Sequence, residues 1–206
     1  ATQIRGLYDF AAIALVAGRA DLTQYYRDRA RRMLDASLSR LVNARYNSFA
    51  SHEGVSSQEA HVDGSTVEML AWDFVAPDHP VFQGTLQLYE RLLTTTGGYR
   101  RLEPNLSLTE SAQAGTYDLS EWVLLDLRIG DTFRKAGNPA RADELLDKIT
   151  QTAKVNDWLV PELFDPNQSG GIYTGVIPMV GYGAGAWQMT QLEKVGLRGP
   201  RYDDGW

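Results

Sequence analysis

Glu162 is the residue whose setting best suits acid or base chemistry. It lies in the segment NDWLVPELFDPNQSGGIYTG, between an expected helix end and a glycine-rich stretch, with Trp158 and Phe164 nearby in sequence. Apolar and aromatic surroundings can tune a carboxyl group for general acid or base catalysis. The same pattern also fits a surface glutamate in a turn, because charged side chains mostly stay exposed.

Aromatic side chains in and after this segment form a candidate sugar-binding platform. The flat faces of Trp and Tyr rings suit the apolar faces of sugars, although each ring could equally belong to the core. The candidates are Trp158, Tyr173, Tyr182 and Trp187.

Further polar candidates lie on expected loops and at helix starts. Arg100 and Arg101 suit either sugar hydroxyls or ordinary ion pairs. His61 and Asp63 could form a polar pair, and Tyr117 stands where a helix is expected to begin. The other loop carboxylates, weaker candidates for catalysis, are Glu53, Glu59, Glu103, Glu110, Asp118 and Glu121.

Composition excludes several classes of protein. The chain has 20 Lys plus Arg against 26 Asp plus Glu, so its net charge of -6 argues against nucleic-acid binding. It has no Cys, and its three histidines show no zinc-motif spacing, so we expect no metal site and no cofactor. No apolar run reaches the roughly 20 residues that span a bilayer, so no membrane segment is expected.

Apolar residues recur at helical spacing along most of the chain, which predicts an all-α fold. The first expected helix ends near Gly18, and proline after Asn138 suits the first turn of another. Leu15 belongs to the apolar face of the first helix and Tyr25 to that of the second, so both are expected to face inward. The remaining expected helices cover about residues 21–42, 64–74, 79–95, 117–136 and 178–195.

Long loops are expected at 43–63, 97–116 and 156–177, after every second helix. In a chain of helical hairpins this places them at one end of the molecule, where sites are usually built. No repeat of fixed length supports an open solenoid, so the pattern favours a closed α/α toroid. No linker divides residues 1–206, which we interpret as part of a single domain.

Three segments in this order resemble the second half of glycoside hydrolase family 15, the glucoamylases, glucodextranases and bacterial trehalases. They are DGSTVEMLAWDFVAPDHPVFQGTLQLYERLLTTTGGYRRLEPN, YDLSEWVLLDLRIGDTFRKAGNPARADELLDKI and WLVPELFDPNQSGGIYTGVIPMVGYGAGAW. The resemblance implies an (α/α)6 barrel that hydrolyses α-glucosidic bonds with inversion, this chain supplying helices six to twelve. It implies that Glu162 is the general base and that Arg101 binds sugar hydroxyls, with Asp63 at the pocket rim. Trp158, Tyr117 and Tyr182 complete the expected substrate contacts.

An inverting glycosidase also needs a general acid. In the family, that acid lies in a Trp-Glu segment before the sixth helix, and this chain resembles the family only from that helix onward. We therefore expect a second polypeptide, or an N-terminal fragment of the same precursor, to complete the barrel. The start at Ala1 rather than Met suggests processing and slightly favours a secreted or periplasmic protein.

Two other functions remain open for a chain with the same toroidal fold. One is a non-catalytic carbohydrate-binding or regulatory subunit, because fold does not fix function. The other is a different sugar enzyme, an epimerase or a lyase, although the paired histidines typical of an epimerase are missing.

Overall fold

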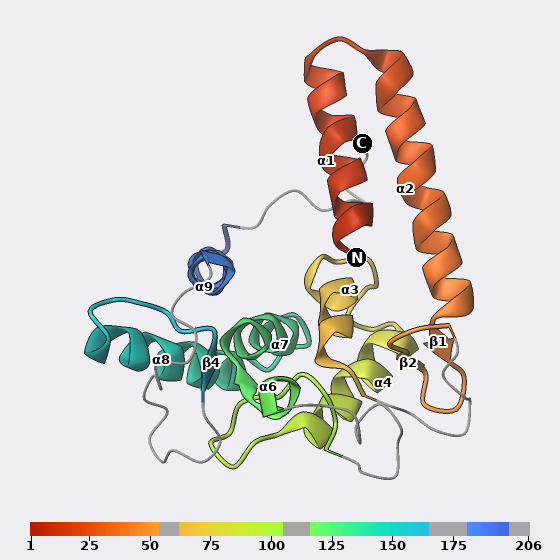
Figure 1. Ribbon diagram of the computed structural model, residues 1–206. Helices are drawn as coiled ribbons and strands as arrows, with labels where there is room; N and C mark the ends of the chain where they lie inside the picture. Colours follow the sequence, from red (N-terminus) through yellow and green to blue (C-terminus); the bar gives the residue numbers. More distant parts are fainter. Residues whose placement is uncertain (54–61, 105–115, 165–180, 198–206) are drawn as a thin grey trace.

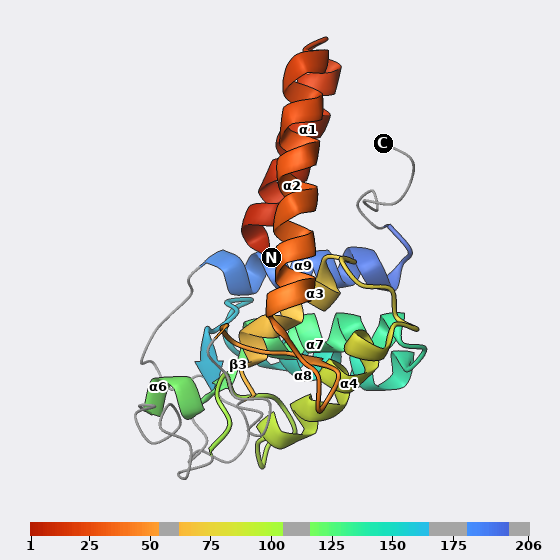
Figure 2. The same ribbon diagram turned by 90° about the vertical axis from the view of Figure 1, so that its right-hand side faces the viewer.

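The structure, a computed structural model, describes residues 1–53, 62–104, 116–164 and 181–197 (Figure 1). Two antiparallel helices, α1 (Thr2–Val16) and α2 (Ala20–Arg40), form a hairpin that projects from a body made by the other elements (Figures 1 and 2). Gly18 adopts a φ of 70° in the turn between them, a conformation that favours glycine. The helix end predicted near Gly18 is thus confirmed.

Small side chains let the two helices of the hairpin pack closely. Ala11, Ala14 and Ala30 are buried between them, and Ile4 is buried at the base of the hairpin. Two residues expected to face inward, Leu15 and Tyr25, are instead exposed. These two expectations were wrong because the hairpin extends beyond the body, so its far end has no core to enter.

The body combines longer helices with several short elements. Two small antiparallel sheets pair β1 with β2 and β3 with β4. The elements are β1 (Val42–Asn43), β2 (Ser48–Phe49), η1 (Gly64–Val67), α3 (Glu68–Ala71), α4 (Pro80–Leu88), η2 (Tyr89–Leu92), α6 (Thr116–Leu119), β3 (Glu121–Trp122), α7 (Val123–Lys135), α8 (Pro139–Val155), β4 (Leu163–Phe164) and α9 (Gly181–Lys194).

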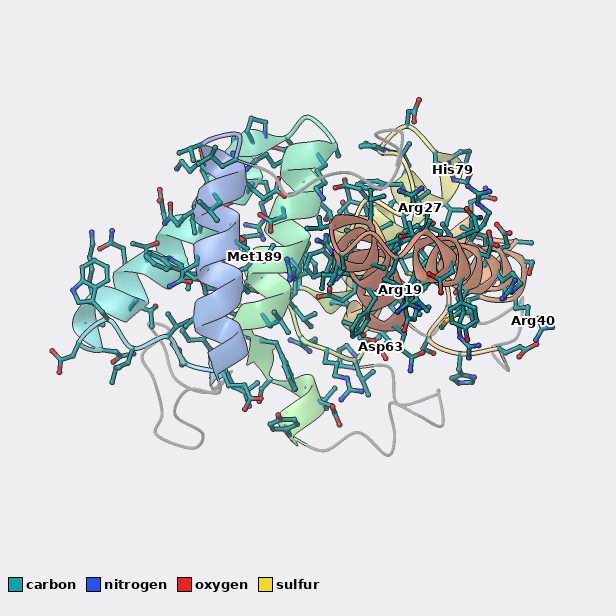
Figure 3. The ribbon with its side chains drawn as sticks, turned by 90° about the horizontal axis from the view of Figure 1, so that it is seen from above. Arg19, Arg27, Arg40, Asp63, His79 and Met189 are labelled. Carbon is teal, nitrogen blue, oxygen red and sulfur yellow. The ribbon has the colours of Figure 1, made fainter. Side chains whose placement is uncertain are left out.

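Helix α7 is the centre of the body. It packs against α8, α9, α3, α4 and η1, and α9 runs beside it when the molecule is seen from above (Figure 3). Its side chains enter two apolar clusters, because Leu125 and Ile129 face one and Val123 and Leu127 face the other. One helix therefore joins the two halves of the core.

Local sequence signals fix where two of the helices begin. The Asn138 side chain accepts a hydrogen bond from the Arg141 N–H at 3.2 Å, with Pro139 in the first turn of α8. His79 Nδ1 accepts from the Val81 N–H at 3.1 Å at the start of α4. Both helix starts agree with the sequence predictions.

Other predicted helices are shorter or interrupted. The expected helix 117–136 breaks at Glu121–Trp122, because this dipeptide pairs with β4. Residues 64–74 divide into η1 and α3, and 79–95 into α4 and η2. Part of the expected loop 43–63 forms the β1–β2 hairpin. In the described parts of the chain, no helix is long and apolar enough to cross a membrane.

A buried acidic side chain lies where α7 meets α9. Asp131 of α7 is only 3% exposed, and its Oδ2 accepts a hydrogen bond from the Thr190 hydroxyl at 3.0 Å. Its Oδ1 has no hydrogen-bond partner among the described residues. Burial raises the pKa of Asp131 to about 6, against an ordinary value of 3.8.

Candidate active site

The carboxylate predicted to be catalytic, Glu162, is held by a two-stranded sheet. It directly precedes β4, whose Leu163 and Phe164 pair with Trp122 and Glu121 of β3. The Val123 N–H donates to the Glu162 carbonyl oxygen at 3.1 Å and extends this pairing by one residue. Glu162 is only 3% exposed. The alternative of a solvated surface glutamate is therefore wrong, because the residue is buried and its backbone is fixed.

Tyr117 touches the Glu162 carboxylate directly. Its hydroxyl donates to Glu162 Oε1 at 2.8 Å, across 45 residues of sequence. Trp122 holds Tyr117 in place, because its indole N–H donates to the Tyr117 carbonyl oxygen at 3.1 Å. The two rings also meet edge to face with their centroids 4.8 Å apart. The Tyr117 ring is 41% exposed, so it is also open to solvent.

Arg101 contacts helix α6 through Asp118 and also lies near Asp63. Arg101 Nη1 donates to Asp118 Oδ1 at 2.9 Å, and its Nε lies 4.0 Å from Asp63 Oδ1. The Leu102 N–H also donates to the Asp118 carbonyl oxygen at 3.1 Å. Two consecutive residues of α6 thus contact two predicted site residues. Tyr117 contacts Glu162, and Asp118 contacts Arg101.

The other predicted contacts are less closely connected. Trp158 follows α8 with a φ of 65° and is 61% exposed, so its ring lies at the surface. Tyr182 falls in the first turn of α9, but its side chain lies outside the described residues, as do His61 and Tyr173 entirely. Trp187 packs against a core cluster and is not a surface platform.

A buried charge cluster beneath the sheet was not foreseen from the sequence. Glu121 and Asp126 are fully buried and share the Lys148 ammonium group, which hydrogen-bonds to Glu121 Oε1 and lies 3.1 Å from Asp126 Oδ2. Thr94 and Thr96 also donate to Glu121. The cluster ties β3 to α7 and α8.

The ionisation of the cluster follows from its charges. Burial, together with the neighbouring Glu121 charge, raises the pKa of Asp126 well above its usual value. For Glu121, burial is outweighed by the Lys148 ammonium and by three hydrogen-bond donors, which hold its pKa below its usual value. The two carboxyl groups of the cluster thus interact with each other and with the Lys148 ammonium group.

A glycine provides the one sequence signal for this cluster. A Cβ atom at Gly98 would overlap the carboxyl groups of both Glu121 and Asp126. The second glycine of GGYRR therefore lets the turn approach the buried charges. Among the described residues, no group of His, Cys, Asp and Glu side chains could hold a metal ion.

Glycosidases are among the solved structures with a similar fold. A wild-type glycosidase matches with a TM-score of 0.68 at 20% identity, over 94% of this chain and 50% of that chain. A variant of a glycosidase in complex with glucose matches with a TM-score of 0.69 at 21% identity, over the same shares. A bacterial glucoamylase in complex with acarbose matches with a TM-score of 0.70 at 16% identity, over 95% of this chain and 33% of that one. No protein-family model matches the chain, and no curated protein matches its sequence.

These likenesses establish the fold. The chain is all-α and corresponds to part of an α/α toroid of the kind found in glucoamylase, as its sequence predicts. It spans half the length of the glycosidase and a third of that of the glucoamylase. At this level of identity the likeness carries the fold alone, and activity has to be argued from the site.

Proposed function

We propose that this chain carries the general-base half of an inverting glycoside hydrolase of family 15 that acts on α-glucosidic bonds. The observation that supports it most is the Glu162 carboxylate, which is buried, fixed by β3 and β4, and hydrogen-bonded by the Tyr117 hydroxyl at 2.8 Å. The same fold occurs in a glucoamylase that binds acarbose and in a glycosidase that binds glucose.

In this mechanism Glu162 activates water. The water oxygen forms a bond to the anomeric carbon while the bond from that carbon to the leaving oxygen breaks. Glu162 accepts the proton of the attacking water, and a general acid on the opposite face protonates the leaving oxygen. The two carboxyl groups of such a pair stand about 6.5 to 9.5 Å apart.

The described loop carboxylates are poor candidates for the general acid. Asp118 is paired with Arg101, Glu103 with Arg91, and Glu121 with Lys148. A general acid must be free to approach the leaving oxygen, and these ion pairs already occupy the three carboxyl groups. We therefore propose that a second polypeptide, or an N-terminal fragment of the same precursor, completes the toroid and brings the acid.

The projecting hairpin supports such a partner. The apolar side chains of Phe10, Ile13 and Val16 on α1 are exposed, Ile13 by 63%. Soluble proteins rarely leave large apolar surfaces uncovered. The neighbours with this fold are two to three times as long as this chain, and we propose that the missing helices of the toroid cover this face.

Product analysis of the completed protein tests the chemistry. Residues 1–206 with their partner should release glucose from a maltooligosaccharide, and the first glucose seen by proton NMR should be the β-anomer. Glu162→Gln should lower turnover by about 10² to 10⁴-fold, because general base catalysis contributes this much. Glu144→Gln removes an exposed carboxylate of α8 and should leave turnover unchanged.

Two outcomes would contradict this assignment. Full turnover in Glu162→Gln would exclude Glu162 as the base. Tight binding of acarbose with no hydrolysis of any α-glucoside would instead support a carbohydrate-binding subunit.

Association is tested separately from chemistry. Expressed alone, residues 1–206 should be aggregated or molten and inactive, and coexpression should give a soluble heteromer with an interface of roughly 2,000 Å² or more. Ile13→Asp should prevent this association, whereas Val155→Asp, at an equally exposed apolar position of α8, should not. A monodisperse, cooperatively melting and active 206-residue monomer would refute the partner.

A further inference from the structure

We infer that Tyr117 is a positioning residue, whose hydroxyl fixes the orientation of the Glu162 carboxylate before any sugar binds. This inference rests on the proposed function, in which Glu162 is the general base. It also changes the role expected for Tyr117 from its sequence, which was contact with the substrate.

The hydrogen bond joins two groups that are both anchored. Glu162 is held through its own carbonyl oxygen, which accepts from the Val123 N–H at 3.1 Å. Tyr117 is held through its carbonyl oxygen as well, which accepts from the Trp122 indole at 3.1 Å. Trp122 and Val123 are consecutive, so one short piece of backbone sets the position of both partners.

Helix α6 is also held by contacts of Asp118. Asp118 accepts from Arg101 Nη1 through its side chain, at 2.9 Å, and from the Leu102 N–H through its carbonyl oxygen, at 3.1 Å. The Tyr117 ring is also in edge-to-face contact with Trp122. The phenol therefore has little freedom to swing away from the carboxylate.

This anchoring matters for a base that activates water. Turnover depends on the alignment of the reacting groups, and a displacement of about 1 Å can cost about 10²-fold in rate. A phenol that occupies Oε1 limits rotation of the carboxyl group about its last bond. The attacking water is then met by a carboxylate already turned toward it.

The test compares kinetics and binding in the completed protein. Tyr117→Phe keeps the ring and its contact with Trp122 but removes the hydroxyl, so the fold should be retained. We expect kcat to fall about 10- to 100-fold while KM and the Kd for acarbose change less than about twofold. Tyr46→Phe, in the turn between β1 and β2, is the matched control and should change neither constant.

A double variant separates positioning from a structural role. If Tyr117 acts through Glu162, then Tyr117→Phe combined with Glu162→Gln should be no slower than Glu162→Gln alone. Losses that multiply in the double variant would overturn the inference. So would a raised KM and acarbose Kd with unchanged kcat, because these would assign Tyr117 to substrate binding.

The failure of this inference differs from that of the proposed function. An inactive Glu162→Gln together with a fully active Tyr117→Phe would overturn only the inference. A fully active Glu162→Gln would overturn both, because no base would be left to position.

Discussion

Replacing Asp131 by Asn should change stability more favourably at pH 8 than at pH 4.5. Asp131 is buried between α7 and α9, with only the Thr190 hydroxyl as a hydrogen-bond donor among the described residues. The charged groups that influence it are Arg128 and Lys135 on α7 and Glu193 on α9. Burial outweighs the two cations and raises the pKa of Asp131 to about 6.

The size of the effect follows from linkage. A raised carboxyl pKa contributes stability below the unfolded-state value of 3.8, and this stability is lost as pH rises through about 6. At about 1.36 kcal/mol per unit of pKa, the whole loss is about 3 kcal/mol. About 2 kcal/mol of it falls between pH 4.5 and pH 8. Asparagine does not titrate, so the Asp131→Asn variant is spared this loss.

The assay is urea unfolding of the completed protein, the chain together with its partner, for wild type and Asp131→Asn at equal concentrations and at both pH values. The difference in unfolding free energy between the two proteins should move by about 2 kcal/mol in favour of the variant at pH 8, or about 4 to 8 °C in melting temperature. Any constant cost of the amide cancels in this comparison, as do other groups that titrate equally in both proteins.

A second aspartate serves as the control. The pKa of Asp143 is lowered, mainly by its hydrogen bond from Arg134. The difference in unfolding free energy between wild type and Asp143→Asn should therefore move slightly in favour of wild type at pH 8. A free-energy difference between wild type and Asp131→Asn that is the same at pH 4.5 and pH 8 would refute the reasoning.

Three further substitutions test other parts of the fold. Lys148→Met should destabilise the protein by about 3 to 5 kcal/mol, since it leaves the buried carboxylates of Glu121 and Asp126 without their cation; adding Asp126→Asn should recover part of this in urea unfolding. Gly84→Ala should lower the unfolding free energy by about 1 to 3 kcal/mol despite the better helix propensity of Ala, because its Cβ would overlap backbone carbonyl oxygens of the turn between β1 and β2. Gly6→Ala, whose Cβ meets nothing within 4 Å, should instead stabilise by about 0.5 to 1 kcal/mol, and a loss there would contradict the steric argument.

Helices with local start and stop signals could be predicted from the sequence. Asn138 and Pro139 predict the start of α8, and Gly18 predicts the turn after α1. Both signals can be read locally because helix capping and a positive φ depend on single residues. The break in the expected helix 117–136 could not be foreseen. It depends on pairing with residues 163–164, and such tertiary pairing overrides local propensity.

The contacts among the predicted site residues could not be read from the sequence. Aromatic neighbours and the family resemblance pointed to Glu162, and the structure agrees that it is buried. Its hydrogen bond to Tyr117 spans 45 residues and leaves no local mark. For Arg101 the sequence left both sugar binding and an ion pair open, and it could not show that Asp118 is the partner. Only Gly98 hinted at the buried charges, through its lack of a side chain.

The hairpin of α1 and α2 also has a consequence for hydrogen exchange. Beyond its base, near Ile4, the two helices pack mainly against each other. Helices of 15 and 21 residues are marginal in water without further packing. The hairpin should therefore open as a separate cooperative unit, and its amides should exchange faster than those of α7. A partner covering Ile13 would slow that exchange, so deuterium uptake along α1 reports occupancy of this face without any catalytic assay.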